Sequence, residues 1–177
     1  SSVTAMCFGC PPDLLGIYGG EIVDVMYTLD VNVFRGEASA QLTVRALRKN
    51  EKQILREEEE RCLYEKILEG TEPADVNDIP VREDFSAVYR IIRHEVSMGR
   101  SIMPIRRLKA LLSQIRPVGY IKLRLTLDVL AELKVINKRE IEPDVVKLED
   151  NALMTKVILE KSTFLKRVKV RSSGERI

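Results

Sequence analysis

The chain has 177 residues, of which 45% are hydrophobic and 32% charged, so it can build a core and is neither collagen-like nor wholly disordered. No apolar run approaches the roughly 18 residues of a membrane-spanning helix, and the first ten residues lack the pattern of an export signal. We therefore expect a soluble protein with no membrane partner. Its three cysteines, an odd number, favour a reducing compartment, which makes the cytoplasm the default location.

The net charge of +2 conceals an asymmetry along the chain. Residues 1–80 carry 8 basic and 15 acidic residues, which leaves 21 basic and 12 acidic residues in the remainder. Such a difference predicts two modules, of which the basic one faces an anionic partner such as nucleic acid. The alternative is that opposite charges balance across a domain interface.

The opening segment is expected to be β-structure. An apolar run at residues 3–8 is rich in β-branched and aromatic residues and predicts a strand, which Gly9 and the prolines after it end. From Glu21 to Phe34 apolar residues mostly alternate with others, and this period of two predicts a long strand with one face on a core. A turn at residues 35–37 leads to another alternating run at residues 41–47, so the two runs form a β-hairpin.

The character of the sequence changes after the hairpin. Residues 51–69 are helix formers with a thin apolar stripe, and Gly70 stands where a helix ends. The acidic run at residues 57–60 is expected to be a solvated face. Residues 71–80 have the proline-containing, polar composition of a linker, so we place a domain boundary there.

The second half begins with three predicted helices. Apolar residues from Phe85 to Val96 recur at helical spacing up to Gly99, which ends this first helix. Pro104 fits the first turn of a second helix. A third helix is expected from about residue 120 to residue 134, although its first turn also alternates like a strand.

The chain ends with short elements. Two β runs around a polar stretch predict a hairpin over residues 135–148, followed by an edge strand at residues 156–159. Ser162 or Thr163 can cap a closing helix. Three helices followed by a β-hairpin is the order of a winged helix-turn-helix, in which the third helix reads the DNA groove.

Few residues in the chain are suited to catalysis. The single histidine, His94, lies on the polar side of a predicted helix, and one histidine cannot form a triad of metal ligands. Cys7 and Cys10 form one C-x-x-C pair, but a zinc site needs two further ligands and a redox pair normally opens a helix. No phosphate-binding loop, dinucleotide-binding glycine pattern or nucleophile elbow is present. We expect no catalytic residue, no metal site and no cofactor in this chain.

Residues suited to nucleic-acid binding occur in both halves. On the hairpin, Arg35 and Arg45 can contact phosphates, while Tyr27 and Phe34 can stack on bases or belong to a core. In the second half, basic residues cluster around the second and third predicted helices, where they can contact phosphates or act as ordinary solubilising charge. These candidates are Arg106, Arg107, Lys109, Lys122 and Arg124.

Short motifs in order along the chain resemble the C-terminal region of RecJ, a single-strand-specific exonuclease. The motifs that resemble its oligonucleotide-binding barrel are Ala5, Phe8-Gly9, Val23-Asp24-Val25, Leu29, Asn32, Phe34, Gly36, Gln41-Leu42 and Val44-Arg45. Those that resemble the extra C-terminal domain of RecJ from low-GC Gram-positive bacteria are Pro80, Arg82-Glu83-Asp84-Phe85, Val88-Tyr89-Arg90, Lys122-Leu123, Leu127-Asp128-Val129, Glu132-Leu133, Leu159 and Ser162. The chain departs from the family at Phe34 and Ala46, where the family often has Trp and Asp.

The resemblance implies a non-catalytic fragment of a larger enzyme. RecJ proteins degrade single-stranded DNA from the 5′ end with manganese or magnesium held in two preceding domains, and none of those metal-binding motifs is in this chain. The implied partners are single-stranded DNA, the catalytic domains of the same protein and a repair or helicase protein. The resemblance also implies that the barrel has one or two further strands before Ser1.

The fold we predict is α+β with three parts. Residues 1–50 form a partial, antiparallel β-barrel of the oligonucleotide-binding (OB) type, residues 51–79 an acidic linking helix and linker, and residues 80–177 a winged-helix-like domain. The predicted function is binding and guiding single-stranded DNA in repair and recombination. The alternatives are a winged-helix regulator that binds duplex DNA, and a protein-docking module.

Overall fold

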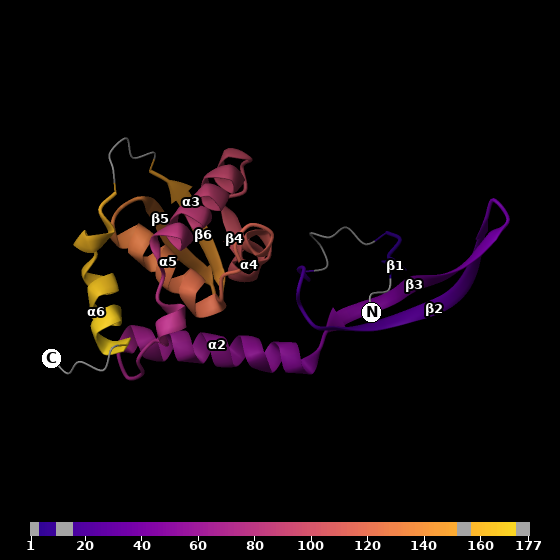
Figure 1. Cartoon of the computed structure of the whole chain (residues 1–177), viewed down its shortest axis with the longest axis horizontal. Coiled ribbons are helices and arrows are strands. Elements are labelled where there is room, and N and C mark those ends of the chain that lie inside the picture. Colours follow the sequence, from indigo (N-terminus) through magenta and orange to yellow (C-terminus); the bar gives the residue numbers. More distant parts are fainter. Residues whose placement is uncertain (1–3, 10–15, 152–156, 173–177) are drawn as a thin grey trace. The chain divides into compact units, whose positions relative to one another are not determined.

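The chain is described by a computed structural model, which covers residues 4–9, 16–151 and 157–172 (Figure 1). It divides into two compact units, Ser1–Glu58 and Glu59–Ile177. The described residues form a mixed α+β structure with five α-helices and two three-stranded sheets, neither of which closes into a barrel. The predicted α+β class is therefore confirmed.

The first unit is built on the predicted β-hairpin. Its strands are β2 (Val23–Phe34) and β3 (Glu37–Lys49), which pair antiparallel along their whole lengths. The two-residue turn between them has positive φ at both Arg35 (54°) and Gly36 (85°). Two positive φ angles are typical of the type I′ turn, whose twist matches that of the paired strands. The strand expected at residues 3–8 is shorter than predicted, because only β1 (Ala5–Met6) pairs, in parallel, with β3.

One face of the hairpin is apolar along its length. The odd-numbered residues of β2 share this face because successive side chains of a strand point to opposite sides. The apolar residues of this set that lie more than one third exposed are Val25, Tyr27, Leu29, Val31 and Val33. Their partners across the hairpin are also all apolar: Leu47, Val44, Leu42, Ala40 and Ala38. The alternation in this strand predicted that one face packs on a core. Within this unit, that face is exposed instead.

The register of the hairpin changes once. Met26 pairs with Ala46 whereas Tyr27 pairs with Val44, so Arg45 is an extra residue on β3. This arrangement is a β-bulge, a feature that bends a strand and re-aims its side chains. Arg45 is exposed there, next to the residue that pairs with Tyr27.

Helix α2 (Glu51–Glu69) has the predicted bounds. It starts where the Asn50 side chain accepts a hydrogen bond from the Lys52 N–H at 2.9 Å, and it stops before Gly70, whose φ is +81°. An Ala at this position would be strained, since L-residues rarely adopt such a φ. Tyr64 and Ile67, near the end of α2, are buried in the second unit.

The second unit carries the predicted three helices and hairpin. The helices are α3 (Arg82–Ser97), α4 (Ile105–Ser113) and α5 (Tyr120–Glu132). Strands β5 (Ile136–Glu142) and β6 (Val145–Asp150) form the hairpin. The short 3-10 turn η1 (Val76–Asp78) precedes α3, and η2 (Leu159–Lys161) precedes the closing helix α6 (Thr163–Ser172).

The third strand of this sheet differs from the prediction. It is β4 (Ile102–Pro104), which pairs antiparallel with β6 in the order β4-β6-β5. The edge strand expected at residues 156–159 is wrong for its described part, because Leu159 opens η2. Lys156 lies outside the described residues. A three-residue strand is too short to show alternation, which explains why the sequence pattern missed β4.

The hydrophobic core of the second unit surrounds α5. Nine of its 13 residues are buried, including Leu123, Leu125 and Leu127. Helix α3 packs Val88 and Ile92 against it, and α4 contributes apolar side chains on its inner face. The helical spacing of Phe85, Val88 and Ile92 therefore predicted the inner face of α3 correctly. None of the helices that the structure describes has the length and apolar composition needed to span a bilayer.

Candidate nucleic-acid interface

The hairpin holds three of the predicted binding residues in exposed positions. Tyr27 lies on β2 with 53% of its surface exposed, Arg45 occupies the bulge, and Arg35 lies at the turn. The side chain of Phe34, the fourth, lies outside what the structure describes. An exposed tyrosine ring near a cation provides the two chemical groups that single-strand binding uses, a stacking face and a phosphate contact.

The cations of α4 have partners inside the second unit. Arg107 contacts the Glu95 carboxylate of α3 through Nη2 at 3.1 Å and Nε at 3.3 Å. Arg100 donates two hydrogen bonds of 2.8 Å to the same carboxylate. Glu95 is 2% exposed, and an isolated buried carboxylate would be strongly destabilising. Arg107 and Arg100 together neutralise it.

Lys109 and Lys122 also belong to ion pairs. The Lys109 Nζ lies 3.5 Å from a carboxylate oxygen of Glu60, which is part of the acidic run of α2. The Lys122 Nζ lies 3.7 Å from Asp84, whose other oxygen accepts a 2.5 Å hydrogen bond from Arg116 Nε. Asp84 is 1% exposed and also accepts the Val81 N–H at 2.9 Å, which caps α3. Lys109 thus links α4 to α2, and Lys122 links α5 to α3.

Arg124 lies within the core of the second unit. It is 5% exposed, and its guanidinium lies 4.3 Å from the ring centroid of Tyr64 and 5.9 Å from that of Tyr120. Its Nη atoms donate three hydrogen bonds of 3.1 Å to Glu140 and Asp144. This position, between two rings and two carboxylates, leaves almost none of the cation at the surface.

The buried Arg124 is part of a larger polar network. The Tyr64 hydroxyl donates a 2.6 Å hydrogen bond to Asp128, which also pairs with Lys138. The Tyr120 hydroxyl donates to Asp144. Burial raises the pKa of both tyrosines well above the usual range, and the neighbouring carboxylates act in the same direction. Both hydroxyls are therefore protonated donors and not nucleophiles at neutral pH.

The predicted groove-reading helix, α5, has little accessible surface. Its only exposed residue is Glu132, and three others are partly exposed. Glu132 accepts hydrogen bonds from Thr163 Oγ1 (2.5 Å) and the Phe164 N–H (3.2 Å), and so holds the start of α6 against α5. A helix that reads bases in the major groove needs free polar side chains along one face. Helix α5 lacks such a face among its residues.

Arg106 is the remaining predicted cation, and it is partly exposed on α4. The binding roles of all nine predicted residues stay predictions. What the structure adds is that four of them, Arg107, Lys109, Lys122 and Arg124, take part in ion pairs within the second unit. The sequence analysis missed a further basic element, α6. The feature of the sequence that could have revealed α6 as basic is its density of cations, which are Lys166, Arg167, Lys169 and Arg171.

The described residues contain no cluster of three or more His, Cys, Asp or Glu side chains that could hold a metal ion. Cys10 lies outside the described residues, so the C-x-x-C pair stays an untested pattern. Comparisons with family models, with curated proteins and with solved structures found no match.

The Glu95 ion pairs predict a pH-dependent contribution to stability. Hydrogen bonds from Arg100, followed by those from Arg107, hold the Glu95 pKa below its usual value of 4.5 despite the opposing effect of burial. Because the pKa is lower in the folded state, the stabilisation is complete above the unfolded-state pKa and is lost as the pH falls through the folded-state value. We expect Glu95→Gln to reduce the free energy of unfolding at neutral pH by about 1 to 3 kcal/mol.

Urea denaturation of both proteins across an acidic pH series would measure this difference. The gap between the native chain and Glu95→Gln should shrink as the pH falls below about 4.5, the usual value. A gap that stays constant over this range would show that the Glu95 charge does not stabilise the fold.

Arg124 and Arg90 provide a matched comparison between a buried and an exposed cation. Arg124→Ala removes a guanidinium packed between two rings and leaves Glu140 and Asp144 without their partner, so we expect a loss of about 3 kcal/mol. Arg90 is exposed on α3, and Arg90→Ala should change stability by no more than about 0.5 kcal/mol. Urea midpoints followed by far-UV circular dichroism provide the measurement. Equal effects of the two changes would contradict the structural role of Arg124.

Proposed function

We propose that this chain is the non-catalytic C-terminal part of a RecJ-type 5′ to 3′ exonuclease and that it binds and guides single-stranded DNA. The observation that carries the proposal is that the β2–β3 hairpin exposes both a ring, Tyr27, and a bulged cation, Arg45, which follows the residue that pairs with Tyr27. Sequence-independent binding of single strands requires a ring on which a base can stack and cations that follow the backbone. The ordered resemblance of the hairpin sequence to the RecJ oligonucleotide-binding barrel supports the same assignment.

In this proposal the hairpin is part of an OB-type barrel and the second unit is winged-helix-like. The long antiparallel pairing of β2 with β3 is compatible with such a barrel, because OB-type barrels are built from antiparallel strands. The order of α3, β4, α4, α5, β5 and β6, with β4 paired to β6, is compatible with a winged helix. The catalytic step would belong to other domains, which would hold manganese or magnesium.

Duplex DNA binding is a second candidate because the same element order occurs in winged-helix regulators. The burial of α5 argues against it, since that is the helix which would enter the groove. Arg124 and Lys122, which the duplex reading would use for phosphate contacts, are engaged with Glu140, Asp144 and Asp84. Binding of a single strand through the hairpin would not require these residues.

Binding of a fluorescent oligothymidylate to the chain tests the proposal. Tyr27→Ala should weaken binding by about 1 to 3 kcal/mol through lost stacking, whereas Tyr27→Phe keeps the ring and should bind like the native chain. Arg45→Gln should also reduce the slope of log affinity against log salt by about 0.7, the value for one phosphate contact on a single strand. An unlabelled duplex should compete poorly.

Thermal denaturation of each variant provides the control for folding, since Tyr27 and Arg45 are exposed and their loss should leave the midpoint nearly unchanged. Native affinity in both Tyr27→Ala and Arg45→Gln would refute binding through the hairpin. Stronger binding to a duplex than to the oligothymidylate would favour the regulator instead.

A further inference from the structure

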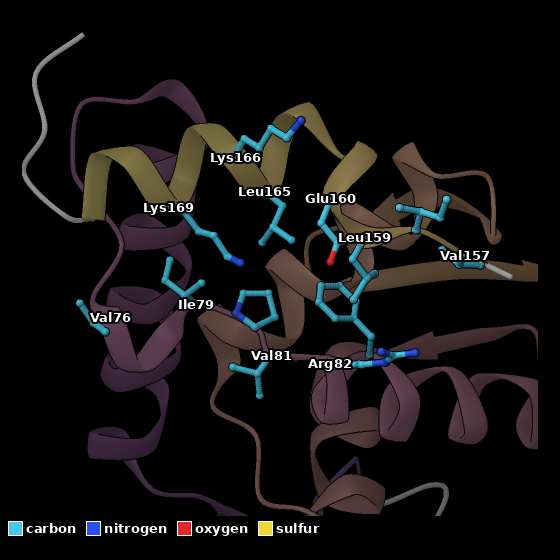
Figure 2. A pocket seen from close by; sticks show the side chains of 13 residues that line it. Val76, Ile79, Val81, Arg82, Val157, Leu159, Glu160, Leu165, Lys166 and Lys169 are labelled. Atoms are coloured by element: carbon cyan, nitrogen blue, oxygen red, sulfur yellow. The ribbon is translucent and has the colours of Figure 1, made fainter.

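The second unit contains an apolar groove that the proposed DNA binding does not use. It has a volume of about 830 Å³ and lies between the segment that leads into α3 and the segment that leads through η2 into α6 (Figure 2). Its apolar lining includes Ile79, Pro80 and Phe85 from the first segment and Leu159 and Leu165 from the second. These segments are about 80 residues apart in the sequence, so no local sequence pattern could predict the groove.

The walls of the groove expose aliphatic side chains to water. Val81 and Ile158, which face the groove from its two sides, are 45% and 46% exposed, and Val76 is 69% exposed. Phe85 and Leu165 lie deeper and belong to the hydrophobic core. Single exposed apolar residues are normal on a surface, but several that converge on one concave site indicate a binding surface.

The charged side chains that line the groove are mostly cations. They are Arg82 at the start of α3, Lys166 and Lys169 on α6, and one carboxylate, Glu160. In Figure 2, Lys169 and Glu160 extend toward the middle of the groove. Three cations around an apolar floor favour an occupant that combines apolar groups with more than one negative charge.

These features distinguish between classes of occupant. A nucleic-acid base would need an exposed ring for stacking, but the aromatic residue of this lining, Phe85, is 5% exposed. A fatty acid would offer an apolar tail but only a single carboxylate. A peptide can place two or three apolar side chains on the floor and carry carboxylates to Arg82, Lys166 and Lys169 at the same time.

We propose that this groove is a docking site for a peptide segment of another protein, one in which leucine- or phenylalanine-type residues are flanked by Asp or Glu. The apolar side chains would be buried against Phe85 and Leu165, which supplies most of the affinity. The cations would select acidic flanks and speed association. This site shares no residue with the hairpin, so its test and the test of DNA binding can fail independently.

The probe is a short fluorescein-labelled peptide in which a Leu-Leu-Phe core is flanked on both sides by aspartates, and fluorescence anisotropy with the full chain measures its binding. Two further peptides serve as controls, one with the core replaced by serines and one with the aspartates replaced by lysines. Both should bind at least about tenfold more weakly than the probe. Added salt should weaken binding of the probe.

Variants of the chain test whether the probe binds in the groove. Val81→Asp and Lys166→Glu should each weaken binding about tenfold. Their matched controls are Met98→Asp, an exposed apolar residue at the other end of α3, and Arg90→Glu, an exposed cation on the same helix as Arg82. Both controls should bind the probe like the native chain. Glu160→Gln removes the one carboxylate of the lining and should tighten binding.

Circular dichroism of each variant confirms that it is folded, and Val81 and Lys166 are exposed enough for substitution to leave the core intact. No binding of the probe up to about 1 mM, the weak limit of specific association, would overturn the proposal. Equal loss in Val81→Asp and Met98→Asp would also overturn it. Displacement of the probe by oleate with higher affinity than the probe itself would show that the groove takes a fatty acid instead of a peptide.

Discussion

The neutralisation of two buried carboxylates determines much of how this chain uses its charges. Asp84 and Glu95 lie on α3 at 1% and 2% exposure, and each must be paired because an isolated buried charge is strongly destabilising. Arg107 reaches Glu95 from α4, and Lys122 reaches Asp84 from α5. These ion pairs therefore join the three helices around the hydrophobic core and also take up cations that the sequence alone would assign to a nucleic-acid surface.

Arg124 extends the same principle into the core. Its guanidinium lies between the rings of Tyr64 and Tyr120 and donates to Glu140 and Asp144, so a single cation connects α2, α5 and the β5–β6 hairpin. The number of basic residues in this half of the sequence thus overstates the number that its surface presents to a nucleic acid. Two surfaces that remain accessible for recognition are the hairpin of the first unit and the region around α6. They differ in chemistry, because the first offers an exposed ring and the second an apolar groove bordered by cations.

The sequence predicted those features that depend on local spacing. The alternation of apolar residues predicted the long hairpin. The helical spacing of apolar residues predicted α3, with Phe85 and Ile92 on its inner face. It could not predict partners that the fold brings together from distant positions. Arg106 and Arg107 are neighbours in one basic run, yet only the tertiary structure places Glu95 beside Arg107. The groove has the same origin, since its two sides come from segments separated by α3, α4, α5 and the second sheet.

The distribution of charges leads to one central claim, that single-stranded DNA is bound by the hairpin and not by the basic helices of the second unit. Backbone amide NMR of the full chain, titrated with an oligothymidylate, tests it most directly because it locates the contact residue by residue. We expect the largest chemical-shift changes between Val23 and Lys49, around Tyr27 and Arg45, and little change in α4 and α5. Changes concentrated on α4 and α5, with an unaffected hairpin, would contradict the claim.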